Sequence, residues 1–141
     1  MNFYVGSGMK NCKRVTYYAE KLIEQGWHQT YDWVKNIDGD ISIEDMVEYA
    51  TLEKQGVADA DVVIILLPAG RGAHIELGMA LALGKKLFLC AQQENDFSIE
   101  NTVAFYELPS VEKLTGTKEE NITEIIKVMS QEKNKVKEKT I

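Results

Sequence analysis

Glu76 is the side chain of this sequence whose position best suits it for chemistry. It lies in the segment Pro68–Gly78 (PAGRGAHIELG), directly after the most apolar run, Val62–Leu67. A run that is apolar at every position predicts a strand covered on both faces, as in the centre of a parallel sheet. Ligands of open α/β sheets bind beyond the carboxyl ends of the strands, so the turn after this strand would deliver the Glu76 carboxylate to a binding crevice. A carboxylate there can act as a nucleophile or exchange protons.

The loop Gly6–Asn11 (GSGMKN) is a candidate anion-binding site. It follows a strand predicted over Asn2–Val5 and opens the next helix, so its backbone N–H groups can point at an anion. The Ser7 hydroxyl and the Lys10 ammonium are within reach of the same anion. The glycine spacing matches neither a Walker sequence nor a dinucleotide-binding fingerprint. An ordinary tight turn between strand and helix is the alternative interpretation.

Arg71, between Gly70 and Gly72, is a second candidate for binding an anion, because a guanidinium can hold a phosphate through two N–H groups. The alternative is a solvated loop arginine. His74 precedes Glu76 by two residues. It is either a general base that accepts a hydrogen bond from a water or hydroxyl in the crevice, or a loop histidine bonded to the backbone.

Asp32 and Trp33 end the predicted second strand, Trp27–Trp33, and complete the candidate site. The Trp33 ring could stack on a base and the Asp32 carboxylate could bind a sugar, while packing of Trp33 in the core is the alternative. Because the carboxyl ends of parallel strands meet at one edge of a sheet, the loops after the first three strands should line a single crevice.

Strand and helix patterns alternate along the chain. Helices are predicted over 13–25, 42–55, 72–83 and 117–130, and strands over 2–5, 27–33, 62–67, 86–90 and, at the edge, 103–106. Two helix starts carry the residue pairs of a capping box, Ser42 with Asp45 and Thr117 with Glu120. This alternation predicts an α/β domain over residues 1–130, doubly wound and Rossmann- or flavodoxin-like, with a parallel five-stranded sheet and helices on both faces. A charged tail that frays, residues 131–141, follows.

Composition and charge limit the partners that we expect. The net charge of −6 and the pI near 5 argue against nucleic acid, and the apolar stretches are too short to span a membrane. Cys12 and Cys90 are too few for a disulfide scaffold and lack metal-ligand spacing, and no signal peptide is evident, which favours the cytoplasm. The predicted helix 72–83 is apolar nearly all round, which indicates burial by a partner subunit in a homodimer or higher homo-oligomer.

Several segments together resemble the nucleoside 2-deoxyribosyltransferase family, whose members include deoxynucleoside 5′-monophosphate N-hydrolases. The resemblance covers about the first ninety residues, and its most specific part is the Glu-Leu-Gly motif after an Ala-Asp-Val-Val strand. It rests on Phe3–Ser7 (FYVGS), Thr30–Trp33 (TYDW), Glu53–Val63 (EKQGVADADVV) and Gly72–Ala82 (GAHIELGMALA). The family implies a small nucleoside or nucleotide as substrate, no cofactor and no metal.

The resemblance also implies roles for individual residues. The glutamate of the Glu-Leu-Gly motif is the family's nucleophile and forms an ester at C1′ of the sugar; it corresponds to Glu76. The acid that handles the proton on the leaving base, usually an aspartate, lies eight positions before the strand aspartate, where this chain has Glu53. Some relatives carry an aspartate six residues before the nucleophile, where this chain has Gly70, so their sugar contact is absent. The family's phosphate-binding serine corresponds to Ser7 or to a residue near Gly70.

The residue types agree with this chemistry independently of the family. Cleavage of an N-glycosidic bond passes through an oxocarbenium-like state, which one carboxylate can trap while a second acid protonates the departing base. We expect the start of a helix to favour the ionised form of Glu76 at neutral pH. The prediction is therefore cleavage or transfer on a (deoxy)nucleoside or its 5′-monophosphate. A nucleotide-binding module without turnover and a glycohydrolase of nicotinamide dinucleotides are the alternatives.

Overall fold

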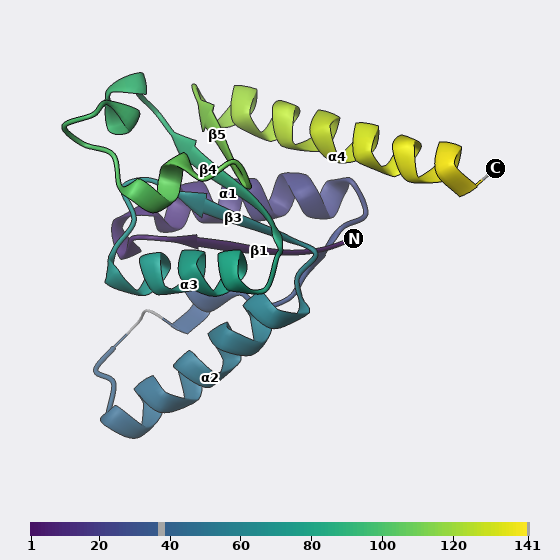
Figure 1. Ribbon diagram of the computed structural model, residues 1–141. Coiled ribbons are helices and arrows are strands. Elements are labelled where there is room, and N and C mark those ends of the chain that lie inside the picture. The colour runs from purple at the N-terminus through teal and green to yellow at the C-terminus, as the bar shows by residue number, and fades with distance from the viewer. Residues whose placement is uncertain (37–38, 141) are drawn as a thin grey trace.

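The computed structural model describes residues 1–36 and 39–140. Five parallel strands form one sheet in the order β2-β1-β3-β4-β5 (Figure 1). The strands are β1 (Asn2–Ser7), β2 (His28–Gln29), β3 (Val62–Leu66), β4 (Lys86–Ala91) and β5 (Val111–Thr115). The α-helices are α1 (Cys12–Glu24), α2 (Ile43–Asp59), α3 (Arg71–Ala82) and α4 (Lys118–Thr140). Short 3-10 helices are η1 (Met9–Asn11), η2 (Trp33–Asn36), η3 (Glu94–Phe97) and η4 (Ala104–Glu107).

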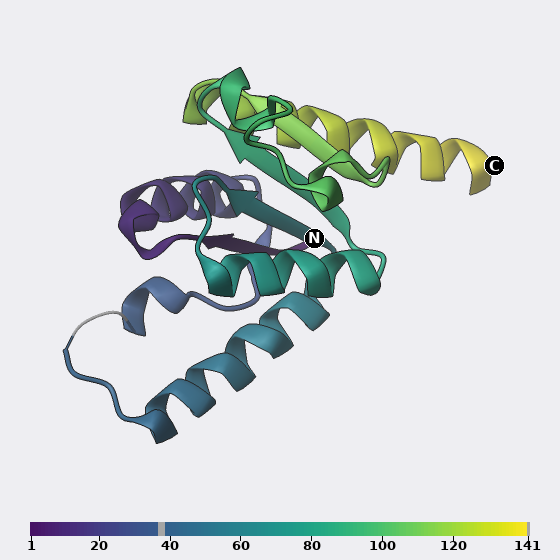
Figure 2. The ribbon, with the colours of Figure 1, turned by 60° about the vertical axis from the view of Figure 1, so that its left-hand side comes forward.

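The helices cover both faces of the sheet, and this confirms the predicted fold class. In Figures 1 and 2, α1 and α4 lie on one face, and α2 and α3 lie on the other. The strand order is that of a doubly wound, flavodoxin-like fold. All five residues of β3 are buried, as expected for a central strand covered on both sides.

The register of the central strands brings the predicted loops together at one edge. Gly6 and Ser7 of β1 lie beside Ile65 and Leu66 of β3. The chain after each strand therefore emerges at the same level, and the Gly8 N–H donates a hydrogen bond of 3.4 Å to the carbonyl of Pro68. The loops that carry the candidate site residues meet here, as the parallel topology predicts.

Two predicted strands need correction. The second strand covers only His28–Gln29, because the chain turns into η2 at Trp33. The stretch 103–106 forms η4 instead of an edge strand, since the Tyr106 side chain is buried beneath it against His74 and Phe97. The strand at this edge is β5 (VEKLT), in which Val111 is buried and the other four residues are half-buried or exposed.

Helix starts follow the sequence signals closely, whereas α2 and α4 end later than predicted, at Asp59 instead of 55 and at Thr140 instead of 130. Both capping boxes are confirmed. The Asp45 N–H donates to the Ser42 hydroxyl, and the Ser42 N–H donates to the Asp45 carboxylate. The Glu120 N–H and the Thr117 N–H donate in the same way to the side chains of Thr117 and Glu120. Gly84, just after α3, has a φ of +67°, which a glycine adopts at low cost. Helix α4 continues to Thr140, so residues 131–140 extend this helix; the lysine- and glutamate-rich stretch contains no proline or glycine that would end it.

Helix α3 packs against the sheet and against α2 but leaves one side exposed, so the all-round burial expected for it is not found within the described part of the chain. Ala73, Leu77 and Ala80 are buried, whereas Ile75 is 62% exposed. Within residues 1–36 and 39–140, no helix combines the length and apolarity that crossing a membrane requires.

Candidate active site

Glu76 and Tyr4 form a hydrogen-bonded pair beneath α3. Glu76 is the sixth residue of α3, and Tyr4 is fully buried on β1. The Tyr4 hydroxyl donates a hydrogen bond to Oε2 of Glu76. Burial and the neighbouring Glu76 charge raise the pKa of Tyr4, so its hydroxyl stays protonated and acts as a donor. A phenol that cannot ionise therefore fixes one oxygen of the carboxyl group.

Gly6 of β1 makes room for the other oxygen of Glu76. A Cβ atom at position 6 would lie 2.9 Å from Oε1 of Glu76 and 3.0 Å from Cδ1 of Ile65, so any larger residue would displace the Glu76 carboxyl group and crowd the Ile65 side chain. Gly6 lies two residues after Tyr4, so both point to the same face of β1. The placement of the carboxyl group therefore requires glycine at this position.

The pKa of Glu76 is raised to about 7, mainly by burial. The hydrogen bond from Tyr4 opposes this shift, and the nearby charge of Glu53 adds to it. The sequence predicted an ionised Glu76 at neutral pH, whereas a pKa of about 7 means that the protonated and ionised forms are both present there. The helix dipole acts mainly within the first turn, and Glu76 lies beyond it.

Glu53 on α2 supplies a second carboxyl group to the site. It is half-buried, and burial raises its pKa above the ordinary value of 4.5. The charge of Glu53 also contributes to the raised pKa of Glu76. The site therefore brings together two carboxyl groups whose pKa values are both raised.

Both carboxyl groups line a cavity of about 570 Å³ at the carboxyl edge of the sheet. The cavity brings together most of the residues predicted from the sequence. Of these, it is lined by Ser7, Trp33, Glu53, Gly70, Arg71, Gly72 and Glu76. Its volume suits a small molecule of nucleotide size.

Ser7 and Trp33 are engaged in the protein's own hydrogen bonds. The Ser7 hydroxyl donates to the carbonyl of Leu66 at 2.8 Å and accepts from Nδ2 of Asn11 at 2.9 Å. The Trp33 indole N–H donates to the carbonyl of Val5 at 2.8 Å, and the ring is 7% exposed. The Ser7 hydroxyl therefore has no proton left to donate to a bound anion. Trp33 can contact a ligand only through the edge or face of its ring.

The start of α3 carries the groups best suited to bind an anion. Gly70 is the N-cap residue, and no side chain caps this end of the helix. Backbone N–H groups at an uncapped helix start are favourable anion partners. Arg71 is exposed at the cavity wall, and no hydrogen bond or ion pair holds its guanidinium within the described part of the chain.

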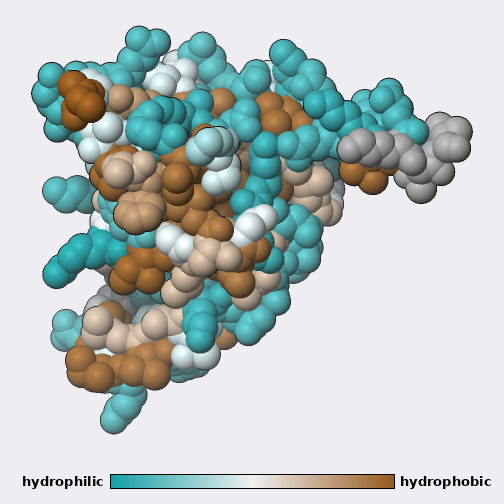
Figure 3. Space-filling view, viewed as in Figure 1, coloured by the Kyte–Doolittle hydropathy of each residue, from teal (hydrophilic) through white to brown (hydrophobic). Residues whose placement is uncertain are grey.

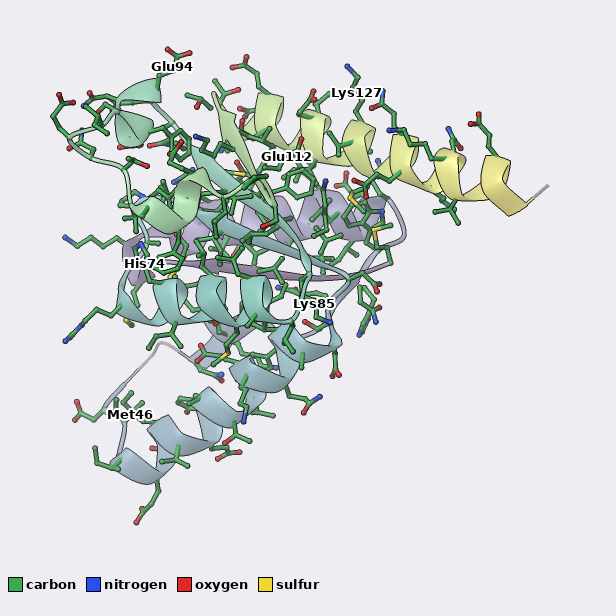
Figure 4. The ribbon with its side chains drawn as sticks, in the orientation of Figure 1. Met46, His74, Lys85, Glu94, Glu112 and Lys127 are labelled. Atoms are coloured by element: carbon green, nitrogen blue, oxygen red, sulfur yellow. The ribbon has the colours of Figure 1, made fainter. Side chains whose placement is uncertain are left out.

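Four predicted site residues do not line this cavity, and one of them, Gly6, lies against Oε1 of Glu76 instead. Lys10 is exposed on η1, and Asp32 accepts a bond from the Val34 N–H and lines a separate small cavity beside α1. His74 faces η4 (Figure 4), where its Nε2 lies 2.6 Å from the Tyr106 hydroxyl and its Nδ1 lies 2.8 Å from the carbonyl of Gly70. This geometry agrees with the second interpretation of His74, a histidine hydrogen-bonded to the backbone, and not with a general base in the cavity.

The sequence patterns missed Tyr4 and the apolar wall of the cavity. Tyr4 lies two residues before Gly6, and this spacing places both residues on the same face of a buried strand. That spacing was the signal in the sequence from which Tyr4 could have been found. Most of the wall comes from α2 and α3, whose relative placement no local pattern reveals, and Gly8 and Met9 come from the loop after β1. Its members outside the predicted set are Gly8, Met9, Met46, Ala50, Lys54, Ala73, Ile75 and Met79.

Replacing Tyr4 with phenylalanine should raise the pKa of Glu76 further, because the Tyr4 hydrogen bond lowers it. Any reaction that needs the Glu76 carboxylate should then lose about 10- to 100-fold in kcat/KM at pH 7. The loss should shrink as the pH rises, which a pH series of kcat/KM would reveal. Tyr49→Phe, outside the cavity, is the control, and an equal loss at every pH would contradict this role.

Comparison with known proteins identifies the fold. No protein-family model and no curated protein matches the sequence. Among solved structures, the CMP N-glycosidase BcmB of Clostridium botulinum is similar, with a TM-score of 0.61 and 19% sequence identity. The match covers 89% of this chain and 98% of that chain. The two proteins therefore share one fold over nearly their whole lengths.

Proposed function

We propose that this protein cleaves the N-glycosidic bond of a nucleotide, with Glu76 as the nucleophile and Glu53 as the general acid. The observation that carries the proposal is a buried carboxyl, oriented by Tyr4, that shares a nucleotide-sized cavity with a second carboxyl. Support also comes from the shared fold, since the similar solved structure is a CMP N-glycosidase, and from the resemblance to the deoxyribosyltransferase family.

In the first step, an oxygen of the Glu76 carboxylate attacks C1′ of the sugar. The bond between C1′ and the base nitrogen breaks, and its electron pair leaves with the base. The Glu53 carboxyl gives its proton to the departing base and becomes a carboxylate. The raised pKa of Glu53 favours the protonated form that this role requires. The product is a free base and a glycosyl ester on Glu76.

In the second step, an acceptor attacks C1′ and releases Glu76. With water as acceptor, the Glu53 carboxylate takes a proton from the water, and the free sugar phosphate leaves. With a second base as acceptor, the same step makes a new nucleotide. The two attacks from opposite sides retain the configuration at C1′.

A 5′-phosphate on the substrate fits the charges at the cavity wall. The uncapped start of α3 and the exposed Arg71 guanidinium lie together there, and both favour an anion. The Ser7 hydroxyl makes a weaker contribution in this proposal, because its proton is already donated to Leu66. A phosphorylated substrate should therefore be preferred over the matching nucleoside.

A homo-oligomer is part of the proposal. The N-terminal half of α2 exposes Ile43 (75%), Met46 (50%) and Val47 (61%), and Figure 3 shows hydrophobic surface over this helix. Met46 also lines the cavity, so apolar surface continues from the cavity wall onto the outside of α2. A contiguous apolar surface of this kind is typical of an interface between subunits.

Glu53→Gln should lower kcat for release of a natural base by at least about 100-fold, because general acid catalysis is lost. The rate of the variant should rise with pH through a single midpoint, that of Glu76. This midpoint should lie below about 7, since the Glu53 charge no longer raises the pKa of Glu76. Kinetics across pH on wild type and variant measure both effects. A variant profile identical to that of wild type would remove Glu53 from the mechanism.

The proposed activity can be tested by incubating the protein with ribo- and deoxyribonucleosides, their 5′-monophosphates and a nicotinamide dinucleotide, and by measuring free base chromatographically. We expect base release from at least one monophosphate at a higher rate than from its nucleoside. A parallel series with an added acceptor base distinguishes transfer from hydrolysis. Tight nucleotide binding in calorimetry without release of any base would contradict the proposal and favour a binding module.

A further inference from the structure

Gly56 lies on α2 at the point where this helix packs against the floor of the site. A Cβ atom at position 56 would lie 3.1 Å from Cδ2 of Tyr4 and 2.9 Å from Cβ of Tyr31. Glycine lowers helix stability by roughly 1 kcal/mol relative to alanine in a helix interior. Its presence in a buried position of a 17-residue helix therefore reflects the close approach of α2 to both Tyr31 and Tyr4.

The same point of α2 is also held by a hydrogen bond. The Thr30 hydroxyl donates to the carbonyl of Gly56 at 2.7 Å. Glu53 precedes Gly56 by three residues, so the two lie on one face of the helix. The distance between α2 and the Tyr4 ring therefore determines how near the Glu53 carboxyl comes to Glu76.

We propose that Gly56 is a positioning residue of the site: its missing side chain lets α2 rest directly on the Tyr4 ring, and this contact places the Glu53 carboxyl beside that of Glu76. The inference deepens the proposed function and rests on it for its catalytic meaning. The charged and titratable groups around Glu76 are Tyr4 from β1, Glu53 and Lys54 from α2, and Arg71 from its own helix.

A methyl group at position 56 should push α2 away from β1. Glu76 would then be less buried and farther from the charge of Glu53, and both changes lower its pKa. In Gly56→Ala we expect the titration midpoint of Glu76, followed by NMR of 13C-labelled glutamate, to fall by about 0.5 pH unit or more. We also expect kcat for base release to fall at least about tenfold.

Gly78→Ala is the matched control. Gly78 lies in the interior of α3, two residues after Glu76, and a Cβ atom there meets nothing within 4 Å. This variant should keep the midpoint near 7, because the added methyl group does not move α2. A folded Gly56→Ala with an unchanged midpoint would overturn the proposal. A lower melting temperature without a shifted midpoint would reduce Gly56 to a packing role and would likewise overturn it.

Thr30→Val provides a second route if Gly56→Ala does not fold. It removes the bond to the Gly56 carbonyl without adding bulk, and it should lower the Glu76 midpoint in the same direction by a smaller amount. An unchanged midpoint in folded Thr30→Val would contradict the proposal. The titration needs no substrate. If the midpoint is shifted in Gly56→Ala but the wild-type protein releases no base, the role of Gly56 is retained and the proposed function is rejected.

Discussion

Replacing Glu76 with glutamine is expected to lower kcat/KM for base release by at least about 1000-fold. Glutamine keeps the size of the side chain and can still accept the hydrogen bond from Tyr4, but its amide is not a nucleophile that can form the glycosyl ester. Removal of a covalent nucleophile commonly costs three or more orders of magnitude. Initial rates with the best substrate of the panel measure the effect.

Glu48→Gln is the control for this variant, because Glu48 is exposed on α2 and does not line the cavity. It should retain wild-type kcat/KM. Circular dichroism and calorimetric nucleotide binding should show that Glu76→Gln remains folded and still binds its ligand. Base release that is undiminished in Glu76→Gln would end the assignment of Glu76 as nucleophile.

The same substitution should stabilise the protein at high pH. The pKa of Glu76 is about 7 in the folded protein and near 4.5 when unfolded, so the unfolded state loses its proton first as the pH rises. The stability that wild type has below pH 4.5 is therefore lost progressively up to about pH 7. The shift corresponds to at most about 3 kcal/mol, an order-of-magnitude value for this mostly buried group. Glutamine has no proton to lose and escapes this penalty.

Urea unfolding at pH 5 and pH 8 measures this difference. We expect the free energy of unfolding of Glu76→Gln to exceed that of wild type by up to about 3 kcal/mol at pH 8, and by less than about 1 kcal/mol at pH 5. Glu48→Gln should match wild type at both pH values. A Glu76→Gln protein less stable than wild type at pH 8 would show that the carboxylate stabilises the fold, contrary to its raised pKa.

The fold was predictable because its signals are local and strong. The fully apolar run 62–67 indicates a central parallel strand, and the two capping boxes mark helix starts that the structure confirms. The edge of the sheet was harder to predict. Val103–Tyr106 has strand-like residues, but Tyr106 packs against His74 from a 3-10 helix, and this long-range contact leaves no mark in the local pattern.

The candidate site was predictable in its loops and less so in its electrostatics. Parallel topology brings Ser7, Arg71 and Glu76 to one edge, as expected. The partnership of Tyr4 with Glu76 joins residues 72 positions apart, and the burial that raises the pKa of Glu76 depends on α2 as well as on the sheet. Membership in the deoxyribosyltransferase family stays a prediction. The fold that this chain shares with a CMP N-glycosidase agrees with that prediction.

The central claim, that an oxygen of Glu76 bonds to C1′ of the substrate sugar, can be tested with a 2′-fluorinated substrate analogue. Fluorine at C2′ destabilises the oxocarbenium-like state and slows release of the ester, so the intermediate accumulates. Intact-mass and peptide mass spectrometry should then find one glycosyl phosphate per chain, attached to Glu76. A label on another residue, or base release with no label under any condition, would contradict the account.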